Sequence, residues 1–540
     1  MMYPSVFLRI ALLAFGLAGL APPAYAAPGD LDTSFGGGFG RVRAQVGGDL
    51  GWVRFSTSEV SGQPSIALQP DGKIVLAGSC KIGATYDFCV VRHNSNGTAD
   101  ATFGDNGLVR TDVRSGDDFV AGLAIQPDGK IVLAGTCQNN LSPTTGRDFC
   151  VVRYTAAGAL DTGFSGDGKL TVSFSSFDDV ATSMALQPDG KIVLAGYCTN
   201  NAGAFNSSGT FGTEVCLARI TSIGDLDTSF NRDGKLITAI GGAIPTRIRN
   251  KANAIAIAAD GKIVITGSNY VGTDASFADT NLLLARFLPS GTLDATFASD
   301  GVVSVDTLSW IVGNAVAIQP DGQIIVAGYR VGGCPGNDCA VALCFTESGA
   351  LDSKFGSFGF ATLDLDSSAL GSFTYSVALQ VDGKTVLAGH CAEAGGRQSF
   401  CFARLNSDGG LDKTFASNGI GSIQFEALNY DYGFSVAVQP DGKIVLGGLC
   451  VESSGSSLCI ARLEGGPFGA RNCSLDIDGD GRVLATTDSL IHARIALGIT
   501  GGAVIGGINF PVGATRDQWG SNTSRDIRKF LLTHCGMVLR

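Results

Sequence analysis

The sequence contains little histidine or tryptophan, with four of the first and three of the second in 540 residues. No two of the histidines stand at the spacing of a zinc-binding pair; they are His93, His390, His492 and His534. No Cys-x-x-Cys pair occurs, and no Gly-x-Ser-x-Gly elbow, phosphate loop or dinucleotide fingerprint stands in a supporting context. We therefore expect a protein that is not an enzyme, although carboxylates that meet only in space leave no trace in a sequence.

Charged residues are also few, at 16%, and acidic residues outnumber basic ones to give a formal net charge of -11. The chain therefore has no basic surface for a phosphate backbone, which excludes nucleic acid as an expected partner. Long apolar runs are missing after the N-terminus, so we expect no transmembrane segment in the mature protein.

The N-terminus itself has the features of an export signal. Arg9 lies in a mostly apolar run from Val6 to Leu20, and the small-residue sequence Ala24-Tyr25-Ala26 follows. This pattern predicts a secretory signal peptide over residues 1–26. A membrane anchor is the alternative, but the run is short for a bilayer span. We expect a secreted protein, extracellular or at the cell surface, with the periplasm also open.

Glycine is abundant, with 76 residues, and much of it belongs to a repeat. The turn and strand Gln187-Pro188-Asp189-Gly190-Lys191-Ile192-Val193-Leu194-Ala195-Gly196 has seven versions along the chain. Each unit also contains a Gly-x-Leu-Asp-x-x-Phe phrase, such as residues 158–164, and successive phrases are roughly 60 residues apart. The chain from residue 27 to residue 465 is therefore a repeat domain.

Each unit contains four predicted strands. In the unit that begins at Gly158 they cover Leu170–Phe174, Thr182–Leu186, Lys191–Ala195 and Cys216–Ile220. Proline, Asp and Gly in the Gln-Pro-Asp-Gly turn favour a tight antiparallel hairpin. The third predicted strand is apolar without alternation, which predicts cover on both faces. The fold class we expect is all-β, a seven-bladed β-propeller of four-stranded repeats, with a β-solenoid as the alternative. If each first strand lies on the preceding blade, the strand near Gly40–Val46 completes the last blade.

Cysteines flank the same loop in most repeats, and both are absent from the fourth repeat, where Asn269 and Leu283 or their neighbours stand. Joint presence and joint absence predict disulfides in an oxidising compartment. The expected pairs are Cys80–Cys89, Cys137–Cys150, Cys198–Cys216, Cys334–Cys339, Cys391–Cys401 and Cys450–Cys459, with Cys473–Cys535 in the C-terminal segment. Cys344 is left over as a buried small hydrophobe. It occupies the position where the other repeats have Arg92, Arg153, Arg219, Arg286, Arg404 and Arg462.

The repeated Asp and Arg are expected to be structural, with the Asp capping a turn and pairing with the Arg. Because antiparallel strands place successive loops at opposite ends, the Gln-Pro-Asp-Gly turns and the Leu-Asp-x-x-Phe phrases share one end of the ring, here called the turn face. The cysteine-flanked loops and the loops between the first and second predicted strands share the other, here called the variable face, where recognition usually resides. The candidate ligand-binding residues on the variable face are Trp52, Trp310, Tyr430 and Tyr432.

The Leu-Asp-x-x-Phe and Pro-Asp-Gly-Lys phrases resemble the delta-60 repeat family over about residues 29–465. The resemblance implies a propeller-like secreted or surface protein and carries no known shared activity. Local departures are Ala258-Ala259 for Gln-Pro in the fourth unit and Val381 for Pro in the sixth.

Residues 466–540 form a different segment, which we expect to be a small α-helical calcium module. Asp476-Ile477-Asp478-Gly479-Asp480-Gly481-Arg482 places oxygens at alternate positions, with glycine at the sharp turn, as a calcium loop requires. The expected ligands are Asp476, Asp478, Asp480, the carbonyl of Arg482 and Asp488. Position twelve is Thr487, so Asp488 either completes the site or caps the following helix. The stretch resembles dockerin-like modules, although it has one such loop and dockerins usually have two.

These observations predict an exported binding or surface-assembly protein. The propeller is the expected recognition scaffold for an extracellular glycan or protein, and the calcium module is a stabilising or docking element. Two alternatives stay open: a secreted carbohydrate-active or other hydrolytic enzyme that uses carboxylates on the variable face, and a purely structural envelope component.

Overall fold

The computed structural model describes residues 26–44, 46, 63–139, 146–200, 212–240, 248–271, 280–305, 310–334, 337–365, 371–393, 396–425, 430–452 and 455–466. Within these residues the chain forms β-strands and one short 3-10 helix, η1 (Gly36–Gly38). No helix in this part of the chain has the length and apolar character needed to cross a bilayer. The predicted calcium module lies outside the described residues and stays a prediction.

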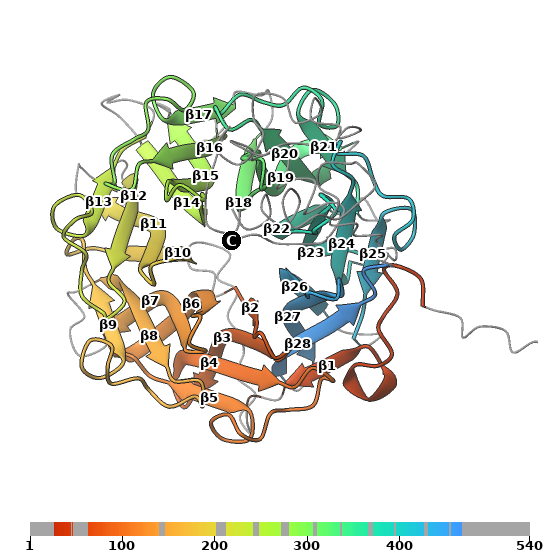
Figure 1. The fold of residues 1–540 in the computed structure, drawn as a ribbon, viewed down its shortest axis with the longest axis horizontal. Helices are drawn as coiled ribbons and strands as arrows, with labels where there is room; N and C mark the ends of the chain where they lie inside the picture. The colour runs from red at the N-terminus through yellow and green to blue at the C-terminus, as the bar shows by residue number, and fades with distance from the viewer. Residues whose placement is uncertain are drawn as a thin grey trace, which may run out of the picture.

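The strands form seven four-stranded antiparallel blades around a common centre (Figure 1). The innermost strands are β2 (Ser65–Leu68), β6 (Ser115–Ile125), β10 (Asp179–Leu186), β14 (Ile248–Ile257), β18 (Ile311–Ile318), β22 (Ser372–Leu379) and β26 (Tyr430–Val438). The second strands are β3 (Ile74–Ile82), β7 (Ile131–Asn139), β11 (Ile192–Asn200), β15 (Ile263–Val271), β19 (Ile324–Cys334), β23 (Thr385–Ala392) and β27 (Ile444–Glu452).

The third strands are β4 (Thr85–His93), β8 (Arg147–Tyr154), β12 (Gly212–Ile220), β16 (Thr280–Phe287), β20 (Asn337–Phe345), β24 (Gln398–Leu405) and β28 (Gly455–Leu463). The outermost strands are β5 (Leu108–Thr111), β9 (Lys169–Val172), β13 (Lys235–Thr238), β17 (Val302–Val305), β21 (Phe360–Leu363), β25 (Ile420–Ile423) and β1 (Arg41–Ala44). We number the blades 1 to 7 by their innermost strands, starting with β2. The propeller prediction is confirmed.

The second strand of each blade is apolar along its length because it packs against both neighbouring blades. In β11, Ile192 and Leu194 face the cluster shared with blade 2, whereas Val193 and Ala195 face the cluster shared with blade 4. All four side chains are fully buried. Burial of apolar surface on both faces is what holds adjacent blades together.

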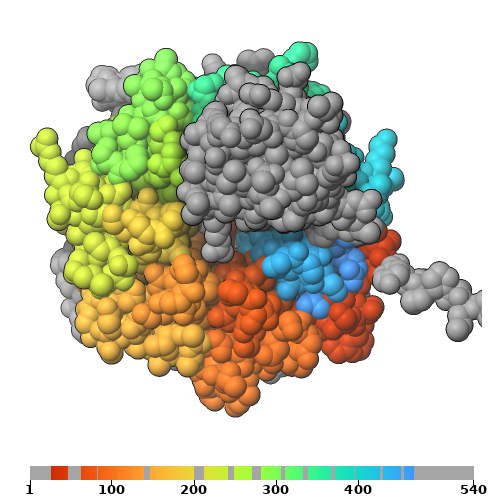
Figure 2. All heavy atoms as spheres, viewed as in Figure 1, coloured from red at the N-terminus to blue at the C-terminus, as the bar shows by residue number. Residues whose placement is uncertain are grey.

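The ring closes by pairing the first strand of the chain with the last. β1 lies antiparallel to β28, with Arg41 opposite Ala461 and Ala44 opposite Leu458, and so becomes the outermost strand of blade 7. Figure 2 shows this red segment against the blue of blade 7 and the orange of blade 1. The conditional prediction for Gly40–Val46 is confirmed: the outermost strand of every blade comes from the start of a sequence unit.

Among the residues that the structure describes, disulfides join the second and third strands of five blades near the variable face. The bonds are Cys80–Cys89, Cys137–Cys150, Cys198–Cys216, Cys391–Cys401 and Cys450–Cys459, with Cα atoms 5.7–6.0 Å apart. Strand pairing continues past the cysteines, to Asn200 opposite Gly212 in blade 3, so these strands are longer than the sequence predicted. Five disulfides fit an extracellular or secreted protein.

The remaining cysteines agree with the sequence where they are described. Cys339 is disulfide-bonded, and Cys344 is a free, buried thiol. The side chains of Cys334, Cys473 and Cys535 lie outside the description. In blade 4, Asn269 takes the position of the first cysteine and accepts a hydrogen bond from Asn250 Nδ2 at 2.8 Å. This contact joins the first and second strands of blade 4, whereas the disulfides of the other blades join the second and third.

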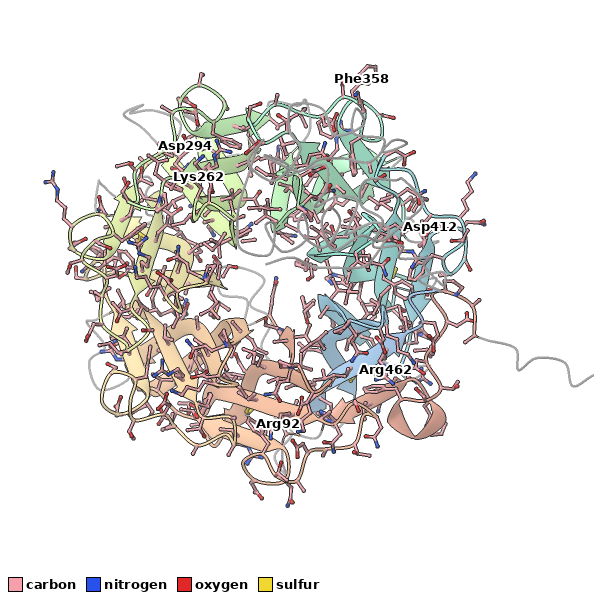
Figure 3. The ribbon with its side chains drawn as sticks, viewed as in Figure 1. Arg92, Lys262, Asp294, Phe358, Asp412 and Arg462 are labelled. Atoms are coloured by element: carbon pink, nitrogen blue, oxygen red, sulfur yellow. A yellow bond between two sulfur atoms is a disulfide. The ribbon has the colours of Figure 1, made fainter. Side chains whose placement is uncertain are left out.

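An Arg clamp recurs in six blades at the turn face. We use this name for the Arg near the end of the third strand, the Asp of the following Leu-Asp phrase and the Phe three residues later. Nε–H of each Arg donates to the Asp carboxylate at 2.6–2.8 Å. The guanidinium lies 4.1–5.0 Å from the centre of the Phe ring. Figure 3 shows clamp residues such as Arg92, Asp412 and Arg462 distributed around the ring.

Each clamp also ties its blade to the next one. The Nη1 group donates to a backbone carbonyl in the turn of the following blade, for example from Arg153 to Ser222 and from Arg404 to Gly465. The Lys of the Pro-Asp-Gly-Lys turn adds a second cation, 2.6–3.9 Å from the same Asp. The predicted Asp–Arg pairing is therefore confirmed, and it is a contact between blades as well as within one.

Candidate functional site

The structure places the two kinds of loop at opposite ends of the blades, as predicted. Each innermost strand meets its second strand through a Gln-Pro-Asp-Gly type turn closed by a backbone bond, such as Gly190 N–H to the Gln187 carbonyl at 2.9 Å. The cysteine-joined hairpins and the connections to the next blade lie at the other ends of the strands. The turn face is thus nearly the same in every blade, and the variable face differs from blade to blade.

The candidate aromatic residues come from different blades of the variable face. Trp310 immediately precedes β18 in blade 5, and its carbonyl accepts the Val331 N–H at 2.9 Å. Tyr430 and Tyr432 belong to β26 in blade 7, where the Tyr430 side chain is 46% exposed. Trp52 lies outside the described residues. Whether these side chains bind a ligand stays a prediction.

Tyr432 belongs to an aromatic cluster that the sequence analysis did not identify. The ring of His390 lies 5.1 Å from that of Tyr432 and 5.2 Å from that of Tyr375. Phe373 and Phe434 extend the cluster across blades 6 and 7. Burial lowers the pKa of His390 to about 4, so the imidazole is neutral at pH 7. Phe373 and Tyr375 are two residues apart in β22, and so are Tyr432 and Phe434 in β26. This alternation places each pair on one side of its strand, and it is the pattern in the sequence that could have indicated the cluster.

Three carboxylates meet at the junction of blades 1 and 2. Asp87 comes from β4, Asp112 follows β5 directly, and Asp118 lies in β6. One oxygen from each residue lies within 4.8 Å of the other two. Asp87 and Asp118 are 2% and 0% exposed, whereas Asp112 is exposed to solvent. We call these three residues the acid cluster.

The acid cluster contains buried oxygens that the rest of the structure does not satisfy. Val113 N–H donates to Asp118 Oδ2 at 2.7 Å, but Oδ1 of Asp118 and Oδ1 of Asp87 have no hydrogen-bond partner among the described residues. Burial and the neighbouring carboxylates raise the pKa of Asp118 to about 8, and burial with the charge of Asp112 raises that of Asp87 to about 6. Buried carboxylates in this state require a proton or a cation.

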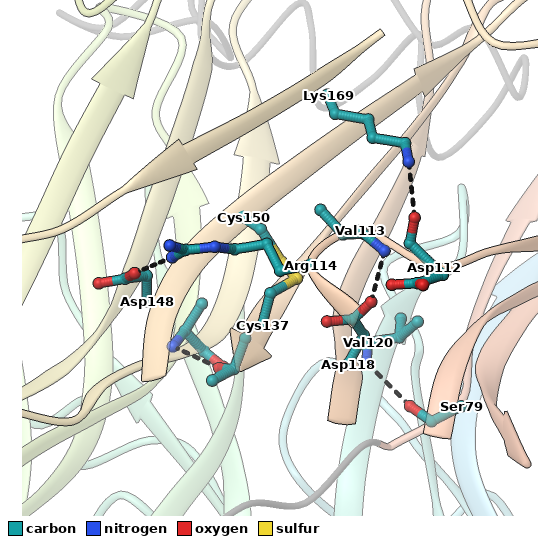
Figure 4. Close-up of a disulfide and its surroundings, with 12 residues drawn as sticks. Ser79, Asp112, Val113, Arg114, Asp118, Val120, Cys137, Asp148, Cys150 and Lys169 are labelled. Atoms are coloured by element: carbon teal, nitrogen blue, oxygen red, sulfur yellow. Dashed lines mark hydrogen bonds and ion pairs between the residues drawn. A yellow bond between two sulfur atoms is a disulfide. The ribbon is translucent and has the colours of Figure 1, made fainter. Parts of the chain in front are cut away.

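The next junction shows how the same two positions are satisfied elsewhere. Between blades 2 and 3, Asp148 and Asp179 stand where Asp87 and Asp118 stand between blades 1 and 2. There Arg114 forms an ion pair with Asp148 (Figure 4). Both oxygens of Asp179 accept hydrogen bonds, from the Phe174 and Ser175 N–H groups and from Ser175 Oγ.

Lys169 carries a positive charge that lowers the pKa of Asp118 against the larger effect of burial, but its ammonium group is already hydrogen-bonded. Lys169 Nζ donates to the backbone carbonyl of Asp112 at 2.6 Å (Figure 4). Lys235 makes the equivalent contact with the Ser173 carbonyl at 3.1 Å. Lys169 is therefore part of the propeller framework and is not a dedicated counterion of the acid cluster.

The geometry of the acid cluster suits a hard divalent cation. Calcium binds carboxylate oxygens at about 2.4 Å, so oxygens on opposite sides of the ion are roughly 4.8 Å apart. The three oxygens lie within that limit. The sequence analysis did not find the cluster. Its members come from two blades and an intervening connection, and no spacing in the sequence reports that.

Sequence comparison finds a family model that matches the repeat. The family described as "Domain of unknown function (DUF5122) beta-propeller" matches residues 69–103, 126–164, 187–230, 258–297, 319–355, 380–415 and 439–465. Each matched segment begins at or near a Gln-Pro-Asp-Gly type turn, and most end at the Phe of the next Leu-Asp phrase. No curated protein has a significantly similar sequence.

Solved structures with a similar arrangement are remote in sequence. The polysaccharide lyase Uly1 is 12% identical, with 79% of this chain and 95% of that chain covered and a TM-score of 0.42. Sqt1 from Chaetomium thermophilum is 12% identical over 78% and 97% of the two chains, with a TM-score of 0.35. A GH43_1 enzyme from Xanthomonas citri is 11% identical over 55% and 90%, with a TM-score of 0.28. At these values no activity transfers. The seven matched segments support a repeat β-propeller, in agreement with the blades of the structure.

Proposed function

We propose that this protein is an exported binding protein that captures an extracellular glycan through a divalent cation held by the acid cluster. The supporting observation is the meeting of Asp87, Asp112 and Asp118, whose buried Oδ1 atoms on Asp87 and Asp118 lack partners among the described residues. Calcium takes six to eight oxygen ligands, so three carboxylates leave coordination positions that sugar hydroxyls fill. The exposed Asp112 marks the side from which a ligand approaches.

The aromatic residues of the variable face supply the remaining contacts. Tyr430 is exposed and lies at the start of β26, next to the aromatic cluster around His390. Aromatic rings pack against the apolar faces of sugar rings while hydroxyls bind the cation. A protein ligand in place of a glycan is an outcome that the capture experiment below identifies.

Hydrolysis of a glycan is the competing function, and the burial of the acid cluster argues against it. A glycosidase places the scissile bond between two carboxyl groups. Asp87 and Asp118 are 2% and 0% exposed, so a glycosidic bond does not fit between them. The proposal is therefore binding without turnover. Release of reducing ends from a polysaccharide panel by the wild type, and its loss in Asp118→Asn, would establish the enzyme instead.

Calcium stoichiometry tests the cation site. The full mature chain should bind one calcium ion at the acid cluster and one at the predicted C-terminal loop. The double variant Asp87→Asn/Asp118→Asn should lose one equivalent, and Asp476→Asn/Asp478→Asn should lose the other, as measured by isothermal titration calorimetry. Asp167→Asn, at an exposed turn-face position, is the matched control. An unchanged stoichiometry in the first double variant contradicts the assignment.

Ligand capture then tests the function. A glycan array and a parallel array of cell-surface proteins are probed with the full chain in calcium and in chelator. We expect saturable glycan capture that chelator abolishes and that Asp87→Asn/Asp118→Asn reduces by at least about tenfold, since each charge-assisted ligand contributes strongly to affinity. If neither chelator nor the double variant reduces capture, the variable face does not bind its ligand through a cation. If no ligand is captured saturably, the structural envelope component is favoured.

A further inference from the structure

The Arg clamp is missing from blade 5, although the register of the strands is unchanged there. Cys344 pairs with Ile325 across β20 and β19, as Arg286 pairs with Val264 in blade 4 and Arg404 with Val386 in blade 6. The second cation is also lost, because Gln323 replaces the turn Lys and donates to Asp352 Oδ2 at 2.6 Å. Asp352 therefore has neither of the two cations that its equivalents have.

The other contacts between blades 5 and 6 at the turn face are the same as those between other neighbouring blades. Gly356 N–H donates to the Asp408 carbonyl at 2.7 Å, as Gly104 N–H donates to the Ala157 carbonyl between blades 1 and 2. Phe355 is buried, and a Cβ on Gly409 would lie 2.9 Å from its ring, so the turn of blade 6 packs closely on Phe355. The groups that surround a clamp guanidinium are retained, and the guanidinium itself is absent.

A pocket of about 760 Å³ opens at this junction on the turn face. Its lining includes Gln323, Asp352, Phe355, Leu379 and Ser407. The volume lies within the range of small-ligand sites and accommodates an arginine side chain with its alkyl stem. Four of the lining residues are aspartates and one is a lysine, so the charge of the pocket favours a cation; they are Asp321, Asp352, Asp382, Asp408 and Lys354.

The retained groups identify the kind of cation. Asp352 is the equivalent of the clamp carboxylates, and its Oδ1 accepts the Lys354 N–H at 3.1 Å, as Asp100 Oδ1 accepts the Thr102 N–H. The Ser407 carbonyl stands one residue before Asp408, the position from which the Ala156 carbonyl accepts a hydrogen bond from Arg92. A carboxylate, a carbonyl and an aromatic face in this arrangement match a planar guanidinium better than a compact ammonium.

We propose that the pocket between blades 5 and 6 binds a guanidinium group from outside the chain, in the place of the clamp arginine that Cys344 removes. Nε–H or Nη–H groups of the ligand donate to the Asp352 carboxylate and to the Ser407 carbonyl, the plane of the guanidinium lies over Phe355, and the alkyl stem packs on Leu379. This site is at the opposite end of the blades from the acid cluster and requires no metal ion.

Cys344 itself takes no part as a nucleophile in this proposal. Its side chain is 1% exposed and belongs to the apolar cluster between blades 5 and 6. Burial and the nearby Asp352 and Asp321 raise the pKa of the Cys344 thiol to about 12, which keeps it protonated at neutral pH. Cys344 is not among the residues that line the pocket, and it matters only as the position at which the clamp Arg is missing.

Ligand titration in chelator tests the proposal on the full mature chain. The probes are agmatine and N-acetyl-arginine methylamide, and the control is N-acetyl-citrulline methylamide, which has the same shape without the charge. We expect both guanidinium compounds to bind at millimolar or lower concentration, and the citrulline compound to bind at least about tenfold more weakly. Equal binding of arginine and citrulline compounds, or no binding of either guanidinium, overturns the proposal.

Variants locate the binding in the pocket. Cys344→Arg supplies the clamp from within the chain, so it should abolish agmatine binding and raise Tm. Cys344→Ala leaves the pocket open and should bind as the wild type does. Asp352→Asn keeps the shape of the side chain and should weaken agmatine binding by at least about tenfold, which keeps the proposal testable if Cys344→Arg fails to fold. Agmatine binding that is the same in wild type and Asp352→Asn contradicts it.

A last comparison separates two sources of the guanidinium. A short peptide with one central arginine is titrated beside agmatine. Tighter binding of the peptide by tenfold or more indicates an arginine side chain of a partner protein, and equal affinities indicate a small guanidine. Because these titrations contain chelator and leave the acid cluster intact, their failure is independent of the outcome for the glycan-binding proposal.

Discussion

The clamp carboxylates of the turn face and the acid cluster of the variable face differ in whether their buried charges are paired. At the turn face, six Asp carboxylates each have an Arg and a Lys within ion-pair distance, and each Arg also bonds to the next blade. At the variable face, the buried Asp87 and Asp118 lie against each other and carry oxygens without partners among the described residues. The clamp carboxylates are thus paired within the fold, whereas the acid cluster retains groups that are costly unless something binds them.

The largest effect should come from breaking a clamp. In Arg404→Ala, Asp412 loses its buried partner and the Gly465 carbonyl loses its donor from blade 6. Because Arg404 is 2% exposed, we expect a loss of about 3–5 kcal/mol in the free energy of unfolding, measured by chemical denaturation. Lys413→Ala, at an exposed position of the same phrase, is the control. Equal stability of the two variants would show that the clamp does not hold the blades together.

A disulfide joins two strands of blade 2 near the variable face. Its removal tests how much this bond contributes to the free energy of unfolding, in comparison with a clamp at the turn face. Cys137→Ser/Cys150→Ser opens a bond with a sequence separation of 13. The expected loss is about 3 kcal/mol, mainly because the unfolded chain gains freedom. Denaturation with and without reductant measures it, and reductant should remove the difference between wild type and variant.

Acid should weaken the turn face. Ion pairs and hydrogen bonds lower the pKa of Asp227 and Asp294 from 3.8 to about 2, despite the opposing effect of burial. A lowered folded pKa gives stability that is present above the unfolded pKa and is lost as pH falls through the folded one, here between about pH 4 and 2. We expect a loss of about 2 kcal/mol from each of the two carboxylates over this range. A flatter profile in Asp227→Asn would confirm the source, and an identical profile would refute it.

The smallest effect should come from the acid cluster in the absence of metal. Asp118→Asn replaces a carboxylate that lies among other carboxylates with a neutral side chain of the same shape. We therefore expect the variant to gain up to about 1 kcal/mol of stability in chelator, the opposite sign to a change at a clamp. The gain is measured as the rise in Tm of the variant over the wild type, by calorimetry in chelator. A clear loss of stability would show that the Asp118 carboxylate stabilises the fold, as the clamp carboxylates do.

The repeat made the fold predictable from the sequence. Seven versions of one turn and one phrase, with cysteines present or absent together, are enough to predict the blades, the disulfides and the Asp–Arg pairs. The exact strand limits were not predicted, because pairing past Cys198 to Asn200 depends on how far the two strands stay together in space.

The sites were harder to predict because they depend on contacts between blades. The substitution at Cys344 was visible in the sequence, but its consequence was not, since only the structure shows that the clamp Arg reaches the following blade. The acid cluster combines Asp87, Asp112 and Asp118 from two blades and their connection. Trp52 and the calcium residues of the C-terminal segment stay predictions, because they lie outside the described residues.

The pairing of β1 with β28 has a consequence for the order in which the molecule is made. Arg41 is synthesised early, yet its partner Ala461 comes more than four hundred residues later. Such long-range pairing is slow to form, because the intervening chain must be ordered first. β1 therefore keeps an unpaired strand edge while the following blades are synthesised. Completion of blade 7 is the event that removes this edge, so a chain truncated before β28 should remain open to association with other chains.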